Sequence, residues 1–259
     1  MKIVINPAYS HLSEFIERIP EGRYSRDMVF RNNRNTIEKI TVENTPLVIK
    51  KYKRPTLFNC AVYTFLRKTK AQRSFEYAFR LKDNGVSTAE PVAYIEIKEK
   101  GVFHTGYFIS EYLDDELLNT IENYDIQTKD KLIEDFSHFT VSLHEKGILH
   151  MDYNSSNILF RREGDDFRFS LIDINRIHFG YLTRRKCLKG LKTMGFELPT
   201  LVRIAERYAE LRGWNPDIFT GALLIKRGMN LPGRIKKKLK SFLGLFKENE
   251  VIEEICGVR

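Results

Sequence analysis

Short runs of β-branched and aromatic residues recur in the first 115 residues, and this pattern predicts strands. The predicted strands are residues 36–42, 47–52, 91–98 and 106–113. The first two are separated by the turn-like sequence ENTP, and the last two by the charged turn KEKG. The N-terminal part of the chain is therefore expected to hold two strand pairs.

Apolar residues at helical spacing predict three helices. They cover roughly Ala71–Asn84, about Thr128–Lys146, and 217–228. The stripe in the longest helix, which should face a core, consists of Leu132, Phe136, Phe139 and Leu143. Asn215 and Pro216 form an N-cap and first-turn pair before the last helix.

A further strand pair, 157–161 and 167–173, follows the longest helix and is joined by the turn 162–166. Strands thus dominate the first part of the chain, and helices dominate the rest. This order predicts an α+β fold of two lobes. We place the N-terminal lobe at residues 1–115 and the C-terminal lobe at residues 116–259.

Charge is the feature of the composition that bears most on function. The chain has 259 residues, a net charge of +9 and an isoelectric point near 9.3. Ten Lys or Arg residues and a single acid lie between Lys50 and Lys82, and a second basic cluster lies at 234–247. Such charge favours an anionic partner. Nucleic acid is not expected, because no aromatic-interleaved or groove-reading motif accompanies the charge.

Several classes are excluded by simple patterns. The first ten residues contain no apolar signal-peptide core, and no run of 18 apolar residues predicts a spanning helix. The three cysteines are far apart in the sequence, so reduced thiols are expected rather than a disulfide framework or a metal knuckle.

The segment HMDYNSSN, residues 150–157, places His, Asp and Asn in the pattern H-x-D-x-x-x-x-N. A capped structural turn also uses such polar residues, so the surroundings must decide between the two interpretations. The segment follows the longest predicted helix and leads into the hairpin that ends in Asp173. This context favours a catalytic loop.

Asp173 follows the apolar pair Leu171 and Ile172, and a carboxylate in such a place is costly unless it is paired or binds a cation. The amide oxygen of Asn157 is a hard ligand, and Mg²⁺ takes few protein oxygens besides phosphate and water. Asn157 and Asp173 are therefore candidate Mg²⁺ ligands. Asp152 is the candidate to orient an acceptor hydroxyl beside a transferred phosphoryl group.

The loop 150–157, together with the sequence DIN at 173–175, resembles the catalytic loop and metal-binding segment of the protein-kinase-like superfamily. The resemblance implies a two-lobed kinase fold that uses ATP and Mg²⁺. It also implies a strand lysine on the nucleotide phosphates, and Lys50 in the sequence LVIK fits that role. A helix carboxylate should hold this lysine, and Glu76 is the acid in the required region.

The segment 108–115, FISEYLDD, resembles the hinge strand of the same superfamily. The resemblance implies that backbone groups of Glu111, Tyr112 and Leu113 bind adenine.

The chain also departs from the superfamily pattern. The sequence FRNNRNTIEKI at 30–40 stands in place of the glycine-rich phosphate loop. Met151 replaces the arginine that usually follows the histidine, and Asn175 replaces a glycine. Only 86 residues follow Asp173, and they contain no A-P-E segment. These departures indicate a compact, atypical branch.

Within that branch, residues 66–94 and the sequence LIDINR at 171–176 are similar to the lipopolysaccharide kinase family, in its Bacteroidetes-type members. The resemblance implies phosphorylation of Kdo or heptose in the lipid A inner core. An anionic glycolipid acceptor would account for the basic surface. The tail at 235–246 mixes Lys with Phe and Leu and could be a membrane-surface helix or a solvated face. Cytoplasmic location is expected, with peripheral contact at the inner membrane.

Two other functions use the same residues. A small-molecule phosphotransferase or a small atypical protein kinase would carry the same catalytic loop. A catalytically silent kinase fold could instead be an anionic-surface binding module, which the missing glycine loop favours. The sequence leaves the oligomeric state and the acceptor hydroxyl open.

Overall fold

The computed structural model describes residues 1–32 and 35–229. The chain divides into two compact units. The first unit comprises residues 1–114 with 171–176, and the second comprises 115–170 with the chain from 177 onward. The tail at 235–246, which the sequence suggested for membrane contact, lies outside the described residues. The described helices include none with the length and apolar character needed to cross a bilayer.

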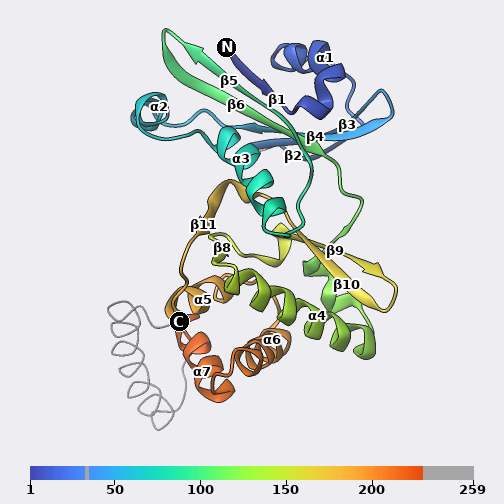
Figure 1. Cartoon of the computed structure of the whole chain (residues 1–259), viewed down its shortest axis with the longest axis vertical. Coiled ribbons are helices and arrows are strands. Elements are labelled where there is room, and N and C mark those ends of the chain that lie inside the picture. Colours follow the sequence, from blue (N-terminus) through green and yellow to red (C-terminus); the bar gives the residue numbers. More distant parts are fainter. Residues whose placement is uncertain (33–34, 230–259) are drawn as a thin grey trace. The chain divides into compact units, whose positions relative to one another are not determined.

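The first unit is built on a six-stranded antiparallel sheet in the order β1-β5-β6-β4-β3-β2 (Figure 1). Its strands are β1 (Lys2–Ile5), β2 (Met28–Asn32), β3 (Asn35–Val42), β4 (Thr45–Tyr52), β5 (Pro91–Glu99) and β6 (Val102–Glu111). The two predicted strand pairs are confirmed as β3–β4 and β5–β6. Glu43 and Asn44 both have positive φ, as the tight turn between β3 and β4 requires.

Helical segments cover the two faces of this sheet. The segments η1 (Pro7–Leu12), α1 (Ser13–Arg18) and η2 (Ile19–Glu21) pack an apolar cluster on one face, which includes Leu12, Ile16, Leu47 and Ile49. Helix α3 (Lys70–Asp83) packs on the other, where Ala71 and Phe75 meet Tyr52, Tyr94 and Phe108. The predicted helix 71–84 is thus confirmed. The shorter helix α2 (Leu57–Phe65) precedes it.

The second unit is mostly helical (Figure 1). Its helices are α4 (Ile126–Glu145), α5 (Arg184–Leu191), α6 (Leu198–Leu211) and α7 (Pro216–Lys226), with the short segments η3 (Leu118–Asn123) and η4 (Ser155–Asn157). Its strands are β7 (Glu116–Leu117), β8 (Ile148–His150), β9 (Ile158–Glu163), β10 (Asp166–Leu171) and β11 (Ile177–Phe179). The longest predicted helix and the last one are confirmed as α4 and α7. The α+β fold class is therefore confirmed.

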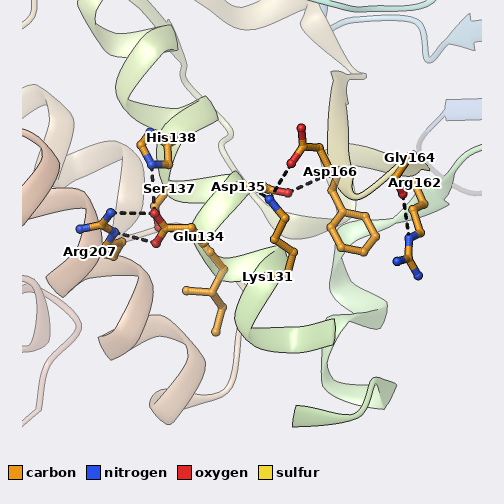
Figure 2. Close-up of polar contacts among 11 residues, drawn as sticks. Lys131, Glu134, Asp135, Ser137, His138, Arg162, Gly164, Asp166 and Arg207 are labelled. Atoms are coloured by element: carbon orange, nitrogen blue, oxygen red, sulfur yellow. Dashed lines mark hydrogen bonds and ion pairs between the residues drawn. The ribbon is translucent and has the colours of Figure 1, made fainter. Parts of the chain in front are cut away.

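Polar contacts on α4 hold the hairpin that follows the HMDYNSSN loop (Figure 2). Asp135 accepts a hydrogen bond from the backbone N–H of Phe167 at 2.8 Å. Lys131 donates to Asp135 and also to Asp166 in β10. On the same helix, Glu134 forms a two-pronged ion pair with Arg207 of α6 at 2.6 and 2.7 Å. The hairpin and α6 are therefore both anchored to α4.

His144 of α4 lies in the core of the second unit, where its Nδ1 is 2.9 Å from the hydroxyl of Tyr208. Burial, with a smaller contribution from Arg212, lowers the pKa of His144 from 6.5 to about 3. The folded protein therefore holds this histidine neutral, whereas the unfolded chain protonates it below pH 6.5. Because the unfolded state then binds more protons, stability should fall as the pH drops from about 6.5 towards 3.

We expect this one group to contribute a slope of up to about 1.4 kcal/mol per pH unit in the free energy of unfolding. Urea unfolding of the wild type and of His144→Gln at pH 7, 6 and 5 measures it. The glutamine variant should show the shallower dependence. Equal slopes in the two proteins would mean that His144 is not held neutral.

Candidate functional site

The two units carry separate groups of candidate residues, and the first group is centred on Lys50. Its side chain is only 10% exposed, and its Nζ lies 2.5 Å from Oδ1 of Asp173. Lys50 and Tyr52 share the face of β4 that packs on α3, whereas the exposed Lys51 points to the opposite face. Lys50 therefore lies on the α3 side of the sheet, and Lys51 lies on the other side.

Asp173 has a backbone φ of +54°, in the left-handed region. A strand cannot continue through this conformation, so β10 ends at Leu171 and not at Asp173 as the sequence predicted. Ser87 and Thr88 fix the backbone of Leu171 through bonds of 2.9 and 2.6 Å. Asn175 donates its side-chain amide to Oδ1 of Asp173 at 2.5 Å, which gives a physical role to the residue that replaces glycine.

The predicted ion pair between Lys50 and Glu76 is not formed. Glu76 instead accepts from Lys68 at 2.7 Å and from Gln72 at 3.0 Å. Ser74 lies on the face of α3 towards the sheet, since its hydroxyl is 2.8 Å from that of Tyr52. A helix turns about 100° per residue, so Glu76 lies about 200° around from Ser74 and points away from the strand. Asp173 takes its place as the partner of Lys50.

Lys70, the first residue of α3, is a cation that the sequence interpretation missed. Its Nζ lies 6.0 Å from the ring centre of Tyr52, and Nζ of Lys50 lies 5.5 Å from the same ring. Desolvation lowers the pKa of Lys70; Asp173 opposes this shift, while Arg73, Lys50 and Arg176 add to it. Lys70 is thus influenced by three other cations and one carboxylate, and an excess of positive charge attracts an anion. No signal in the sequence separates Lys70 from the other basic residues of its run.

The predicted hinge residues differ in what their backbones can still bind. The N–H of Glu111 donates to Glu90 O, and that of Tyr112 donates to Pro46 O, both at 2.9 Å. Leu113 forms no hydrogen bond within the described part of the chain. The backbone N–H of Leu113 is therefore unused among the described residues, and those of Glu111 and Tyr112 are already bonded.

The second group of candidates lies in the HMDYNSSN loop of the second unit. The buried His150 ends β8, and its Nδ1 accepts the backbone N–H of Asp152 at 3.1 Å. Tyr153 is fully buried beneath the loop, 2.9 Å from Thr140 Oγ1, and Thr193 donates to its carbonyl at 3.0 Å. The loop is therefore fixed from below by its backbone and by Tyr153.

The side chains of Asp152 and Asn157 are left available by these contacts. Asn157 donates its amide to the carbonyl of Asp152 at 2.9 Å, so its Oδ1 is unused among the described residues. The carboxylate of Asp152 is exposed and accepts no hydrogen bond from any described residue. A purely structural turn would use such a carboxylate as a cap, and here Asn154 caps the following turn instead.

Two of the predicted site residues, one in each unit, offer oxygens of the kind that magnesium binds. Asn157 offers an amide oxygen and Asp173 a carboxylate, both hard ligands of the kind that Mg²⁺ binds together with phosphate oxygens and water. In the first unit, the ammonium groups of Lys50 and Lys70 are cations of the kind that suits phosphoryl oxygens.

Comparisons with known proteins agree on one family. Residues 48–201, more than half of the chain, match the lipopolysaccharide kinase (Kdo/WaaP) family. A solved structure described as WaaP in complex with acyl carrier protein aligns with a TM-score of 0.60 and 18% identity, over 93% of this chain and 99% of that one. No curated protein sequence matches.

Two further solved structures align with TM-scores of 0.49, which is too weak to bear on this chain. One is a Rio2 kinase complex with ADP, Mg²⁺ and phosphoaspartate from Chaetomium thermophilum, at 14% identity over 95% of this chain and 78% of that one. The other is a streptomycin–ATP–APH(2")-IIa complex, at 12% identity over 82% and 87%. The WaaP likeness bears on the fold, and the family match carries the assignment: the chain belongs to the lipopolysaccharide kinase (Kdo/WaaP) family and is an ATP-dependent phosphotransferase.

Proposed function

We propose that this protein transfers the γ-phosphate of ATP to a hydroxyl of Kdo or heptose in the lipopolysaccharide inner core. The observation that carries the proposal is the carboxylate of Asp152, which is presented by a loop fixed from below and has no partner among the described residues. The family match supports the class of acceptor, and the net charge of +9 suits an anionic one.

In this reaction the acceptor oxygen forms a bond to the γ-phosphorus, the bond from that phosphorus to the β–γ bridging oxygen breaks, and ADP leaves. Asp152 orients the acceptor hydroxyl and receives its proton. Lys50 and Lys70 hold the nucleotide phosphates, and Leu113 meets adenine through its backbone. Asn157 and Asp173 would hold Mg²⁺, which would neutralise charge on the phosphates.

In the resting protein, Asp173 and not Glu76 holds Lys50 in place. We propose that the ammonium groups of Lys50 and Lys70 take over part of the role of the missing glycine-rich loop, because ammonium groups can replace backbone N–H groups as phosphate donors.

Lys70→Ala is expected to raise the KM for ATP about tenfold, because one charge-assisted bond to phosphate contributes roughly 1.5 kcal/mol. Lys82→Ala is the matched control, since Lys82 lies near the other end of α3 and pairs with Glu90. Steady-state kinetics with varied ATP measures both variants. An unchanged KM in Lys70→Ala would remove this residue from the nucleotide site.

The acceptor can be identified with truncated lipopolysaccharides. We expect mass spectrometry to show one added phosphate on acceptors ending in Kdo or heptose. Comparing two acceptors that differ only in the presence of heptose decides which of the two sugars is phosphorylated. Aminoglycosides and a generic protein substrate test the alternative acceptors. Phosphate transfer to these soluble acceptors and not to lipopolysaccharide would contradict the lipopolysaccharide proposal. Tight ATP binding without turnover on any acceptor would favour a catalytically silent binding module.

The proposed location of the protein is the cytoplasmic face of the inner membrane, where both a lipid A precursor and ATP are accessible. The chemistry supports this location because the donor nucleotide is cytoplasmic and the acceptor is held in a leaflet by its acyl chains.

A further inference from the structure

Helix α2 presents apolar side chains to solvent. Leu57, Phe58 and Phe65 are 77–79% exposed, and Leu66, directly after the helix, is 83% exposed. Leu57, Phe58, Ala61 and Phe65 recur at spacings of three and four, so they form one stripe on the helix. A helix that is apolar on its outer side is normally buried, and soluble surfaces rarely gather large side chains in this way.

The other side of α2 is fixed to the first unit, so the exposed stripe has a defined direction. Cys60 is buried, and Tyr63 meets Phe103 of β6 edge to face at 5.7 Å. Thr64 accepts the backbone N–H of Phe103 at 2.8 Å. Figure 1 shows α2 at the margin of this unit, beside the sheet. One side of α2 is therefore packed against the first unit, and the other side is exposed to solvent.

Basic residues flank the stripe at both ends. Lys53 and Arg54 precede α2, Arg67 follows it, and all three are exposed with no ion-pair partner among the described residues. No acid occurs between Lys50 and Phe75. An open pocket of about 510 Å³ lies at the end of the helix, and its wall includes Phe65, Leu66, the cations Lys2, Arg67 and Lys98, the Lys68 side chain that pairs with Glu76, and one acid, Glu96. Apolar and cationic groups thus share one surface.

We propose that α2 docks the protein onto an anionic lipid surface. Leu57, Phe58, Phe65 and Leu66 enter the boundary between headgroups and acyl chains, and Lys53, Arg54 and Arg67 lie over lipid phosphates. This role deepens the proposed action on a glycolipid, because it names the surface that brings the enzyme to its acceptor. Lipid binding needs neither ATP nor turnover, so the two proposals can fail independently.

The size and charge of the surface favour lipid over a protein partner. A stable protein interface takes about 800 Å² from each side, whereas α2 is a helix of nine residues, roughly 13 Å long and about 10 Å wide. Insertion into a bilayer needs no such area, because each apolar side chain and each cation contributes separately. An acidic protein is the competing occupant, and the experiment distinguishes it.

Flotation of the full chain with vesicles tests the proposal. The vesicles contain either phosphatidylcholine alone or phosphatidylcholine with 30% phosphatidylglycerol, a composition chosen to supply negative charge. The apolar variant is L57S/F58S/F65S, with Ile126→Ser on α4 as control because Ile126 is 66% exposed on the other unit. The charge variant is R54A/R67A, with K189A/K192A as control. Circular dichroism and thermal unfolding verify that each variant is folded.

The wild type and both controls should float with the anionic vesicles and bind neutral vesicles at least tenfold more weakly. The apolar variant and the charge variant, which together are called the α2 variants, should each bind the anionic vesicles at least tenfold more weakly than the wild type. Wild-type protein that stays unbound, or α2 variants that bind as the controls do, would overturn the proposal. If the wild type ignores lipid but cross-links to purified acyl carrier protein through α2, the surface is a protein-docking site and the lipid assignment is wrong.

Discussion

Replacing Asp152 with alanine is expected to lower kcat for phosphate transfer by about 10²- to 10⁴-fold, the usual loss when a positioned proton acceptor is removed. The KM for ATP should change little, since the proposed role of Asp152 concerns the acceptor hydroxyl. The loop itself should survive, because its anchors are the backbone of Asp152, the buried Tyr153 and His150. Initial rates with saturating ATP and acceptor measure the effect.

Asp165→Ala is the matched control for this variant. Asp165 is an exposed aspartate in the turn between β9 and β10, and it accepts no hydrogen bond or ion pair from a described residue. It should retain full activity. If Asp152→Ala keeps more than a tenth of the wild-type kcat while remaining folded, the assignment of Asp152 as the residue that receives the proton is wrong.

Asp173→Asn is expected to lower kcat/KM by at least about 10²-fold, because it removes a carboxylate that the proposed mechanism places on Mg²⁺. Asparagine is the right replacement, since it tolerates the left-handed backbone at φ +54° that alanine would strain. The variant also removes the ion pair with Lys50, so the fold of the first unit must be verified by thermal unfolding.

A magnesium titration separates the two roles of Asp173. A metal ligand should raise the Mg²⁺ concentration needed for half-maximal activity, whereas a mere counter-ion of Lys50 would leave it unchanged. Asp83→Asn, at the exposed end of α3, serves as the control. Wild-type kcat and an unchanged Mg²⁺ requirement in Asp173→Asn would contradict the metal assignment.

Elements with a strong local pattern were predictable from the sequence. The strand pairs β3–β4 and β5–β6 are runs of β-branched and aromatic residues bounded by turn residues, and α4 carries a regular apolar stripe. The short strands β1 and β2 were missed, because four or five residues give too little periodicity. Helix α2 was missed for another reason: it is apolar on both sides and therefore shows no alternation between a core face and a polar face.

The candidate site was named from two motifs. Lys50 was named from the sequence LVIK, and the HMDYNSSN loop from its spacing. The ion-pair partner of Lys50 was not predicted correctly, because the choice between Glu76 and Asp173 depends on how α3 is rotated against the sheet. Lys70 was missed since its importance comes from Tyr52 and Asp173, which are distant in sequence.

The central claim is phosphate transfer from ATP to a lipopolysaccharide sugar through Asp152. The most direct measurement incubates the wild type and Asp152→Ala with [γ-³²P]ATP, Mg²⁺ and a Kdo-containing lipid A precursor, and then quantifies label in the extracted lipid. We expect label with the wild type and a loss of about 10²-fold or more with the variant. Equal labelling by the two proteins, or no labelling of the lipid by a wild type that transfers phosphate to another acceptor, would contradict the claim.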